Sequence, residues 1–130
     1  MSRFNERVEN FSKAFNIYQE AVNAFDTSKI LTHMALVQTY EICFELAWKC
    51  LKDYLQEKGI EVNYPTEVIK EAFNNETIKN GQLWIDMLKA RNATSHEYNI
   101  DKVSKYLTEI STTYFEEIKK FKIWLGEISE

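Results

Sequence analysis

The sequence has few of the residues that break helices. Its 130 residues include three Gly and one Pro, while 45% are hydrophobic and 28% are charged. Scarce turn-forming residues favour a few long helices over many short strands, and this hydrophobic content argues against disorder. A chain of this length can bury most of its apolar surface in one core. We therefore expect an all-α protein with a single domain over residues 1–130.

The sequence also lacks an excess of positive charge and any long apolar run. The formal net charge is −4 and the pI is near 5.3, so the chain has no general attraction for a polyanion. No apolar run approaches the roughly 20 residues of a membrane span, and the first ten residues lack the apolar stretch of a signal peptide. We expect no DNA partner, no membrane partner and a cytoplasmic location; any contact with nucleic acid must come from a local site.

Residues that bind metals are scarce and unsuitably spaced. His33, His96, Cys43 and Cys50 form neither a Cys-x-x-Cys nor a His-x-x-x-His pattern, so we assign no metal and no cofactor. The two cysteines lie seven residues apart on a predicted helix, roughly 10 Å along its axis, which is too far for a disulfide. They are predicted to be buried thiols. His33 is predicted to be a partly exposed or hydrogen-bonded structural residue.

Several enzyme motifs are missing. The sequence has no Gly-rich phosphate loop, no Gly-Ser followed by paired aspartates and no Gly-x-Ser-x-Gly elbow. The chain therefore cannot by itself carry out ordinary Mg-dependent nucleotide transfer or serine hydrolysis, and such chemistry requires a partner.

Apolar residues recur at steps of three and four, the spacing of one helical face. They predict long helices over about 3–25, from a cap at residues 26–28 to about 55, from about 83 to near 99, and over about 103–125. A short helix is predicted after Pro65, with a buried face made of Val68, Ile69, Ala72 and Phe73. Short connections between consecutive helices favour an antiparallel up-and-down four-helix bundle with one additional short helix. The middle of the second helix is apolar on more than one side. This pattern favours a homodimer, with a well-packed monomer as the alternative.

The segment 91–98 carries most of the reactive side chains. On a regular helix Arg91, Ser95 and Tyr98 share one face. His96 points about 140° away from Arg91, on a stripe with Asn92 and Asn99. Arg91 and His96 therefore converge only if the helix is distorted or a second subunit contributes. A dimer-interface site is the simpler arrangement.

These side chains offer guanidinium, imidazole, hydroxyl and amide groups, a set that suits the phosphodiester of RNA or a nucleotide. His96 has the chemistry to move a proton and Arg91 to stabilise phosphate charge in a metal-independent cleavage of RNA. The Arg-to-His spacing is weak alone, because a surface arginine and a helix-terminal histidine are common. Glu41 and Glu45 form an i, i+4 pair that is either a solvated face or a polar lining of the cleft.

The order of several motifs resembles a known family. The motifs are Phe44-Glu45-Leu46-Ala47-Trp48-Lys49, Leu51-x-Asp53-Tyr54-Leu55, Glu71-Ala72-Phe73, Leu83-Trp84 and Arg91-Asn92-x-x-Ser95-His96-x-Tyr98-Asn99. Together they resemble the nucleotidyltransferase substrate-binding protein family, part of the HEPN superfamily of helical bundles. The resemblance covers nearly the whole chain.

The resemblance implies a homodimeric four-helix bundle that forms a complex with a separate minimal nucleotidyltransferase. In related pairs the bundle is an RNase toxin and the transferase is its antitoxin. The family pattern of Arg, four residues, His, one residue and Tyr then makes Arg91 and His96 catalytic and Tyr98 the acceptor of AMP. An added nucleotide brings negative charge and bulk to the place of the RNA phosphate.

Three interpretations stay open at this point. The chain is a substrate-binding partner subunit in a toxin–antitoxin-like pair, an RNase toxin inactivated by AMPylation of Tyr98, or a structural helical-bundle interaction protein.

Overall fold

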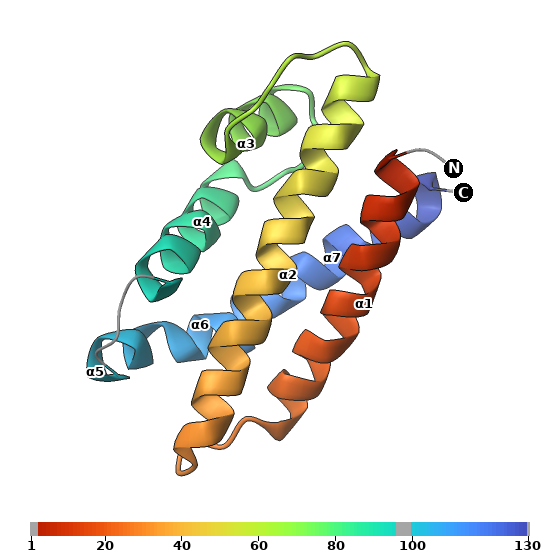
Figure 1. Cartoon of the computed structure of the whole chain (residues 1–130). Coiled ribbons are helices and arrows are strands. Elements are labelled where there is room, and N and C mark those ends of the chain that lie inside the picture. The colour runs from red at the N-terminus through yellow and green to blue at the C-terminus, as the bar shows by residue number, and fades with distance from the viewer. Residues whose placement is uncertain (1–2, 96–99, 130) are drawn as a thin grey trace.

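The computed structural model describes residues 3–95 and 100–129, and within these ranges it contains helices and turns but no β-strand (Figure 1). The elements in chain order are α1 (Arg3–Ala24), α2 (Ile30–Glu57), α3 (Pro65–Asn74), α4 (Gly81–Ser95), α5 (Ile100–Val103), the 3₁₀ turn η1 (Ser104–Tyr106), α6 (Leu107–Ser111) and α7 (Thr113–Ile128). The prediction of an all-α protein is confirmed. The predicted end of the fourth helix near residue 99 lies outside the described residues.

Helices α1 and α2 lie side by side and run in opposite directions, joined by a tight turn (Figure 1). The Asp26 carboxylate accepts hydrogen bonds from the backbone N–H of Ser28 at 2.8 Å and from its hydroxyl at 2.6 Å. Lys29 is the N-cap of α2, and its side chain makes no capping hydrogen bond. The predicted cap at residues 26–28 is therefore wrong in position, because these side chains stabilise the turn itself.

Helix α2 is the centre of the fold and packs against α1, α3, α4, α6 and α7. It ends where Gly59 adopts a φ of 83°, a left-handed conformation that glycine accepts without strain. Pro65 then begins α3, as predicted. The predicted buried face of α3 is wrong at Phe73, which is 50% exposed and lies across Gly81 at the start of α4. A Cβ atom at Gly81 would lie 3.1 Å from the Phe73 ring, so a glycine at this position leaves the space that the ring occupies.

The last helical segment is divided. The sequence predicts one helix over about 103–125, but the chain forms α5, η1, α6 and α7, with a break at Thr112. Thr112 has φ −125° and ψ −83°, and its hydroxyl donates to the carbonyl oxygen of Thr108 at 2.6 Å. Such a side chain competes with the helical hydrogen bonds of the backbone, which apolar spacing alone does not report. Helices α6 and α7 pass behind α2, and α7 reaches α1 (Figure 1).

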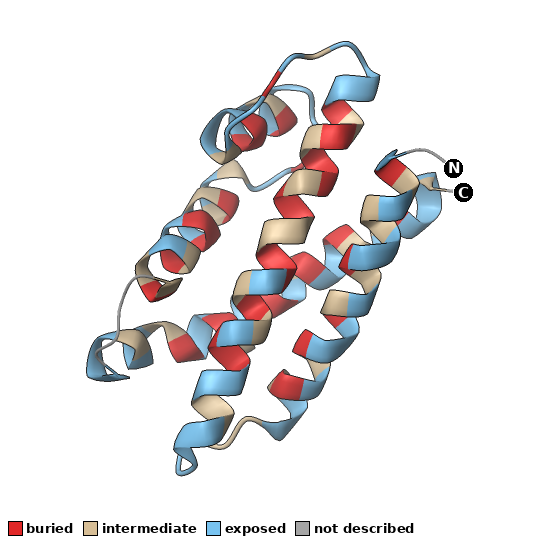
Figure 2. Ribbon diagram, viewed as in Figure 1, coloured by how far each residue is buried: buried red, intermediate tan, exposed pale blue. Residues whose placement is uncertain are grey.

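The buried residues lie mainly on the sides of the helices that face other helices (Figure 2). Their side chains form one cluster that is rich in aromatic rings. Two tyrosine hydroxyls inside it donate to backbone carbonyl oxygens, Tyr18 to Ile110 and Tyr40 to Met87 at 2.7 Å. Burial raises the pKa of both tyrosines well above the ordinary value. Cys43 and Cys50 are buried free thiols, as predicted. In the part of the chain that is described, no helix is long and apolar enough to cross a membrane.

Candidate functional site

The structure brings several of the predicted site residues to the contact between α2 and α4. Arg91, Asn92 and Ser95 lie on the last turns of α4, and Glu41 and Glu45 lie one turn apart on α2. The remaining predicted residues, His96, Tyr98 and Asn99, lie outside the described residues. The site is therefore built here from α2 and from the end of α4.

The Arg91 guanidinium is held along one edge. Its Nη2 lies 3.4 Å from Glu45 Oε2, and its Nη1 donates to Asn92 Oδ1 at 3.4 Å. Its Nε is buried and has no hydrogen-bond partner within the described part of the chain, although 29% of the side chain is exposed. Since Nε is covered by protein, an incoming oxyanion can reach only the exposed part of the guanidinium, where it competes with Glu45.

Glu45 is itself held in place from two further sides. The indole Nε1 of Trp48 donates to Glu45 Oε2 at 2.9 Å, and Lys49 Nζ lies 3.5 Å from Oε1. The carboxylate is therefore fixed against Arg91. Of the two roles that the sequence leaves open for this glutamate, the geometry favours lining of the site.

Glu41 has a different partner. Thr94, which is buried with 6% of its surface exposed, donates its hydroxyl to Glu41 Oε2 at 2.6 Å. Sequence reasoning missed Thr94. A signal was available, since Thr94 follows Met87 by seven residues and so places a hydroxyl on the apolar stripe of α4. A buried polar group on such a stripe requires a hydrogen-bond partner.

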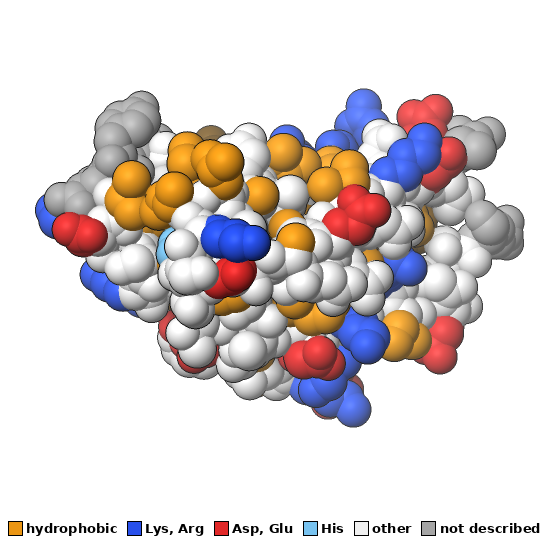
Figure 3. Space-filling model, turned by 90° about the horizontal axis from the view of Figure 1, so that it is seen from below, with side chains coloured by type: hydrophobic (Ala, Val, Ile, Leu, Met, Phe, Trp, Pro, Cys, Tyr) orange, Lys and Arg blue, Asp and Glu red, His pale blue; other side chains and the backbone are white. Residues whose placement is uncertain are grey.

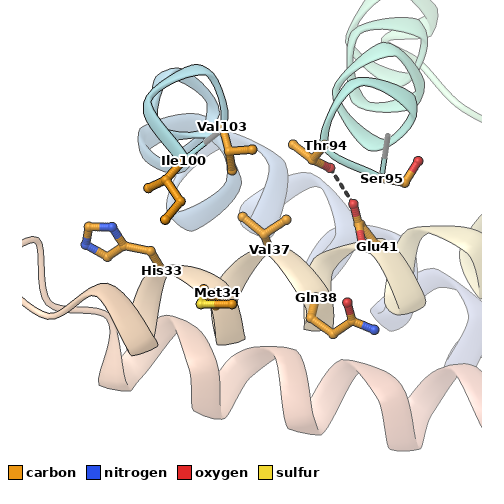
Figure 4. A pocket seen from close by; sticks show the side chains of 9 residues that line it. All are labelled: His33, Met34, Val37, Gln38, Glu41, Thr94, Ser95, Ile100 and Val103. Carbon is orange, nitrogen blue, oxygen red and sulfur yellow. Dashed lines mark hydrogen bonds between the residues drawn. The ribbon is translucent and has the colours of Figure 1, made fainter. Parts of the chain in front are cut away.

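A pocket of about 350 Å³ opens beside Glu41, between α2, the end of α4 and the start of α5 (Figure 4). Its lining consists of His33, Met34, Val37, Gln38, Glu41, Thr94, Ser95, Ile100 and Val103. A second hollow of about 340 Å³ contains Arg91 and Glu45, and it shares Gln38 and Glu41 with the first. The two hollows therefore lie next to each other along α2. The first contains Glu41 and Thr94, and the second contains the Arg91 guanidinium and Glu45.

His33 lies at the far end of the first pocket from Glu41 (Figure 4). Its Nε2 lies 3.1 Å from the carbonyl oxygens of Asp26 and Thr27, and its ring faces Phe25 at 5.4 Å. Because both partners are acceptors, Nε2 must be the nitrogen that carries the proton. This environment agrees with the prediction of a hydrogen-bonded structural histidine.

Side chains that could hold a metal do not gather in the structure. Within residues 3–95 and 100–129, no group of three His, Cys, Asp or Glu side chains is placed to bind an ion.

The outer face of α2 exposes apolar side chains next to the site. Leu31 is 75% exposed, Met34 59% and Ile42 49%. Hydrophobic side chains gather in a band on the face seen from below (Figure 3). The prediction that α2 is apolar on more than one side is confirmed.

Comparisons with known proteins find one matching family model and a solved structure of similar fold. The family model described as "Nucleotidyltransferase substrate binding protein like" matches residues 6–127. A protein of Thermus thermophilus with a known crystal structure superimposes with a TM-score of 0.80 at 25% sequence identity, over 92% of this chain and 99% of that one. No curated protein matches the chain.

Proposed function

Because the chain belongs to the nucleotidyltransferase substrate binding protein-like family, we propose that it is the partner subunit of a separate minimal nucleotidyltransferase in a toxin–antitoxin-like pair in the cytoplasm. The observation that carries this proposal is the family match over residues 6–127. The chain lacks the motifs of nucleotide transfer, so the transferase supplies that chemistry. This chain supplies a binding surface and the polar groups between α2 and α4.

Complex formation tests this proposal. The chain is co-expressed with the small transferase encoded in a neighbouring reading frame, recognised by its Gly-Ser and Asp-x-Asp motifs. We expect the two proteins to co-purify and to elute together in size-exclusion chromatography. Separate elution of two folded proteins would contradict the proposal and would favour the structural helical-bundle interpretation.

A second candidate function is a metal-independent RNase that the transferase silences. It is favoured by the partly exposed Arg91 guanidinium, which lines a hollow of about 340 Å³. In this mechanism Arg91 binds the scissile phosphate of RNA and offsets the charge that develops there, while His96 moves the proton. AMP on the Tyr98 hydroxyl then places a negative phosphate where the RNA phosphate must lie.

RNA cleavage by the isolated chain distinguishes these functions. Wild type, Arg91→Ala and His96→Ala are incubated with total tRNA in the presence of a chelator. We expect cleavage by wild type and by the control Lys89→Ala, but not by Arg91→Ala or His96→Ala, because Lys89 is an exposed cation on the same helix that takes no part in the reaction. In a separate reaction the chain is incubated with the transferase, ATP and Mg²⁺, in which AMP moves from ATP to the tyrosine oxygen, pyrophosphate leaves and the hydroxyl proton is released. An increase in intact mass by one AMP group, absent in Tyr98→Phe, identifies the acceptor. A folded wild type that leaves tRNA intact would refute the nuclease function and leave the partner function standing.

We further propose that the four long helices form an antiparallel up-and-down bundle within a single domain, and that two copies associate as a homodimer through the outer face of α2. The exposed side chains of Leu31 and Ile42 support this interface. Ile42 also lines the hollow that contains Arg91, so a two-fold axis on this face would bring the Arg91 hollows of both copies to the same interface. We expect a dimer in multi-angle light scattering and a folded monomer for Leu31→Glu combined with Ile42→Glu. A monomeric wild type would contradict the dimer.

A further inference from the structure

The pocket between α2, α4 and α5 is apolar along its walls and acidic at one end (Figure 4). Met34, Val37, Ile100 and Val103 form its apolar walls, and Glu41 lies at the end nearest α4. The pocket therefore combines an apolar lining with one carboxylate.

Glu41 has no countercharge within the described ranges. Its Oε2 accepts the Thr94 hydroxyl at 2.6 Å, but no lysine, arginine or histidine of the described residues lies within ion-pair distance of it. This differs from Glu45, one turn away, which pairs with both Lys49 and Arg91. A partly buried carboxylate in apolar surroundings is stabilised by a cation that enters and pairs with it.

The ligands that match this shape are basic side chains. Lysine and arginine each place a cationic head on an apolar stem, so the stem can contact the walls while the head meets the carboxylate. The volume of about 350 Å³ leaves room for either. The formal charge of −4 on this chain also favours a partner with a basic surface, and the Glu41 charge disfavours an RNA phosphate at this position.

We propose that this pocket receives a lysine or arginine side chain of the nucleotidyltransferase, which pairs with Glu41. This inference rests on the proposed partner function and adds the contact by which the two proteins recognise each other. Ser95 and Ile100 both line the pocket, and in the sequence they flank the segment that carries Tyr98. A transferase held at this pocket therefore contacts the two described residues that precede and follow this segment in the sequence.

The decisive measurement is the affinity of the purified transferase for three forms of this chain: wild type, Glu41→Gln and the control Glu20→Gln. Glutamine keeps an acceptor for the Thr94 hydroxyl but removes the charge, so the fold is preserved. Glu20 is an exposed acid on α1 and makes no contribution to the pocket. We expect Glu41→Gln to weaken binding by at least about tenfold and to reduce its dependence on NaCl concentration, with the control unchanged.

A second variant tests the shape of the pocket without changing its charge. Ile100 is 52% exposed, so Ile100→Trp can fill the opening while leaving the core intact. We expect it to weaken the complex as well. Wild-type binding by both Glu41→Gln and Ile100→Trp, with an unchanged salt dependence, would overturn this inference alone. Failure of wild type to bind the transferase would overturn the proposed function with it.

A nucleobase is the other occupant that an apolar pocket with one carboxylate could hold, and it is tested with AMP and GMP. The isolated chain is titrated with each nucleotide by calorimetry, and we expect no binding that depends on Glu41. Nucleotide binding by wild type that is lost in Glu41→Gln would assign the pocket to a base and overturn the proposal.

Discussion

Loss of one partner from the ion pair between α1 and α2 should destabilise the chain measurably. Arg7 Nε lies 3.1 Å from Asp53 Oδ2, with 27% of the arginine side chain exposed and 4% of the aspartate. At an effective dielectric constant of about 20, the Coulomb attraction at this distance is roughly 5 kcal/mol before desolvation is subtracted. Breaking a fully buried pair costs about 3–5 kcal/mol, and the partial exposure of Arg7 lowers this. For Arg7→Met we expect a loss of about 2 kcal/mol.

Urea unfolding followed by circular dichroism measures this loss, and the melting temperature should fall by roughly 6–10 °C. The control is Lys13→Met, which breaks an exposed pair with Glu9 and should change stability by less than about 0.5 kcal/mol. The double variant Arg7→Met with Asp53→Leu should recover most of the loss, since no unpaired buried charge remains. A loss below about 0.5 kcal/mol in Arg7→Met would refute the reasoning, because the buried carboxylate would then not need its partner.

Further predictions concern the thiols, the site and the core. Burial raises the pKa of Cys50 to about 12 and that of Cys43 further, so neither should react with Ellman's reagent at pH 8 faster than the chain unfolds. Since the unfolded chain releases these protons at an ordinary thiol pKa, stability in urea titrations should fall as the pH rises above about 9. If RNA binds at Arg91, Glu45→Gln should raise its affinity severalfold in fluorescence anisotropy, because the competing carboxylate charge is removed; an unchanged affinity would contradict this placement. Tyr40→Phe should lower the free energy of unfolding by about 1–2 kcal/mol, because a buried backbone carbonyl on α4 loses its donor.

Helix positions followed from apolar spacing wherever the spacing was the dominant signal. The stripe that includes Phe11 and Tyr18 located α1, and Pro65 located the start of α3. The break at Thr112 escaped this reasoning, because the inward positions keep their period on both sides of it. The non-helical backbone of Thr112, whose hydroxyl donates to the carbonyl oxygen of Thr108, leaves no trace in that period. Phe73 escaped it for another reason: its ring lies against Gly81 at the start of α4 and stays half exposed, and a contact between two helices cannot be read from spacing within α3. The single domain, the bundle topology and the homodimer stay predictions.

The composition of the site was easier to predict than its pairings. The sequence predicted Arg91, Glu41 and Glu45 as site residues. The structure adds that Glu45 pairs with the Arg91 guanidinium, whereas Glu41 accepts a hydrogen bond from the Thr94 hydroxyl. Which glutamate meets which residue depends on the register between α2 and α4, and this register is set by packing rather than by either helix alone. The roles of His96 and Tyr98 remain predictions from the family resemblance.

The two carboxylates of α2 give neighbouring parts of the site opposite charge preferences. At Arg91 the ion pair with Glu45 joins groups that are 29% and 31% exposed, so water screens it and a phosphate can displace it at a cost of about 1 kcal/mol or less. At Glu41 the carboxylate is unpaired within the described residues and favours a cation. An RNA phosphate and a basic residue of the transferase would therefore occupy adjoining hollows rather than compete for one. Electrostatic repulsion alone therefore does not explain how a docked transferase would prevent RNA from binding. Inhibition then requires either bulk at the Arg91 hollow or the added phosphate of a nucleotide.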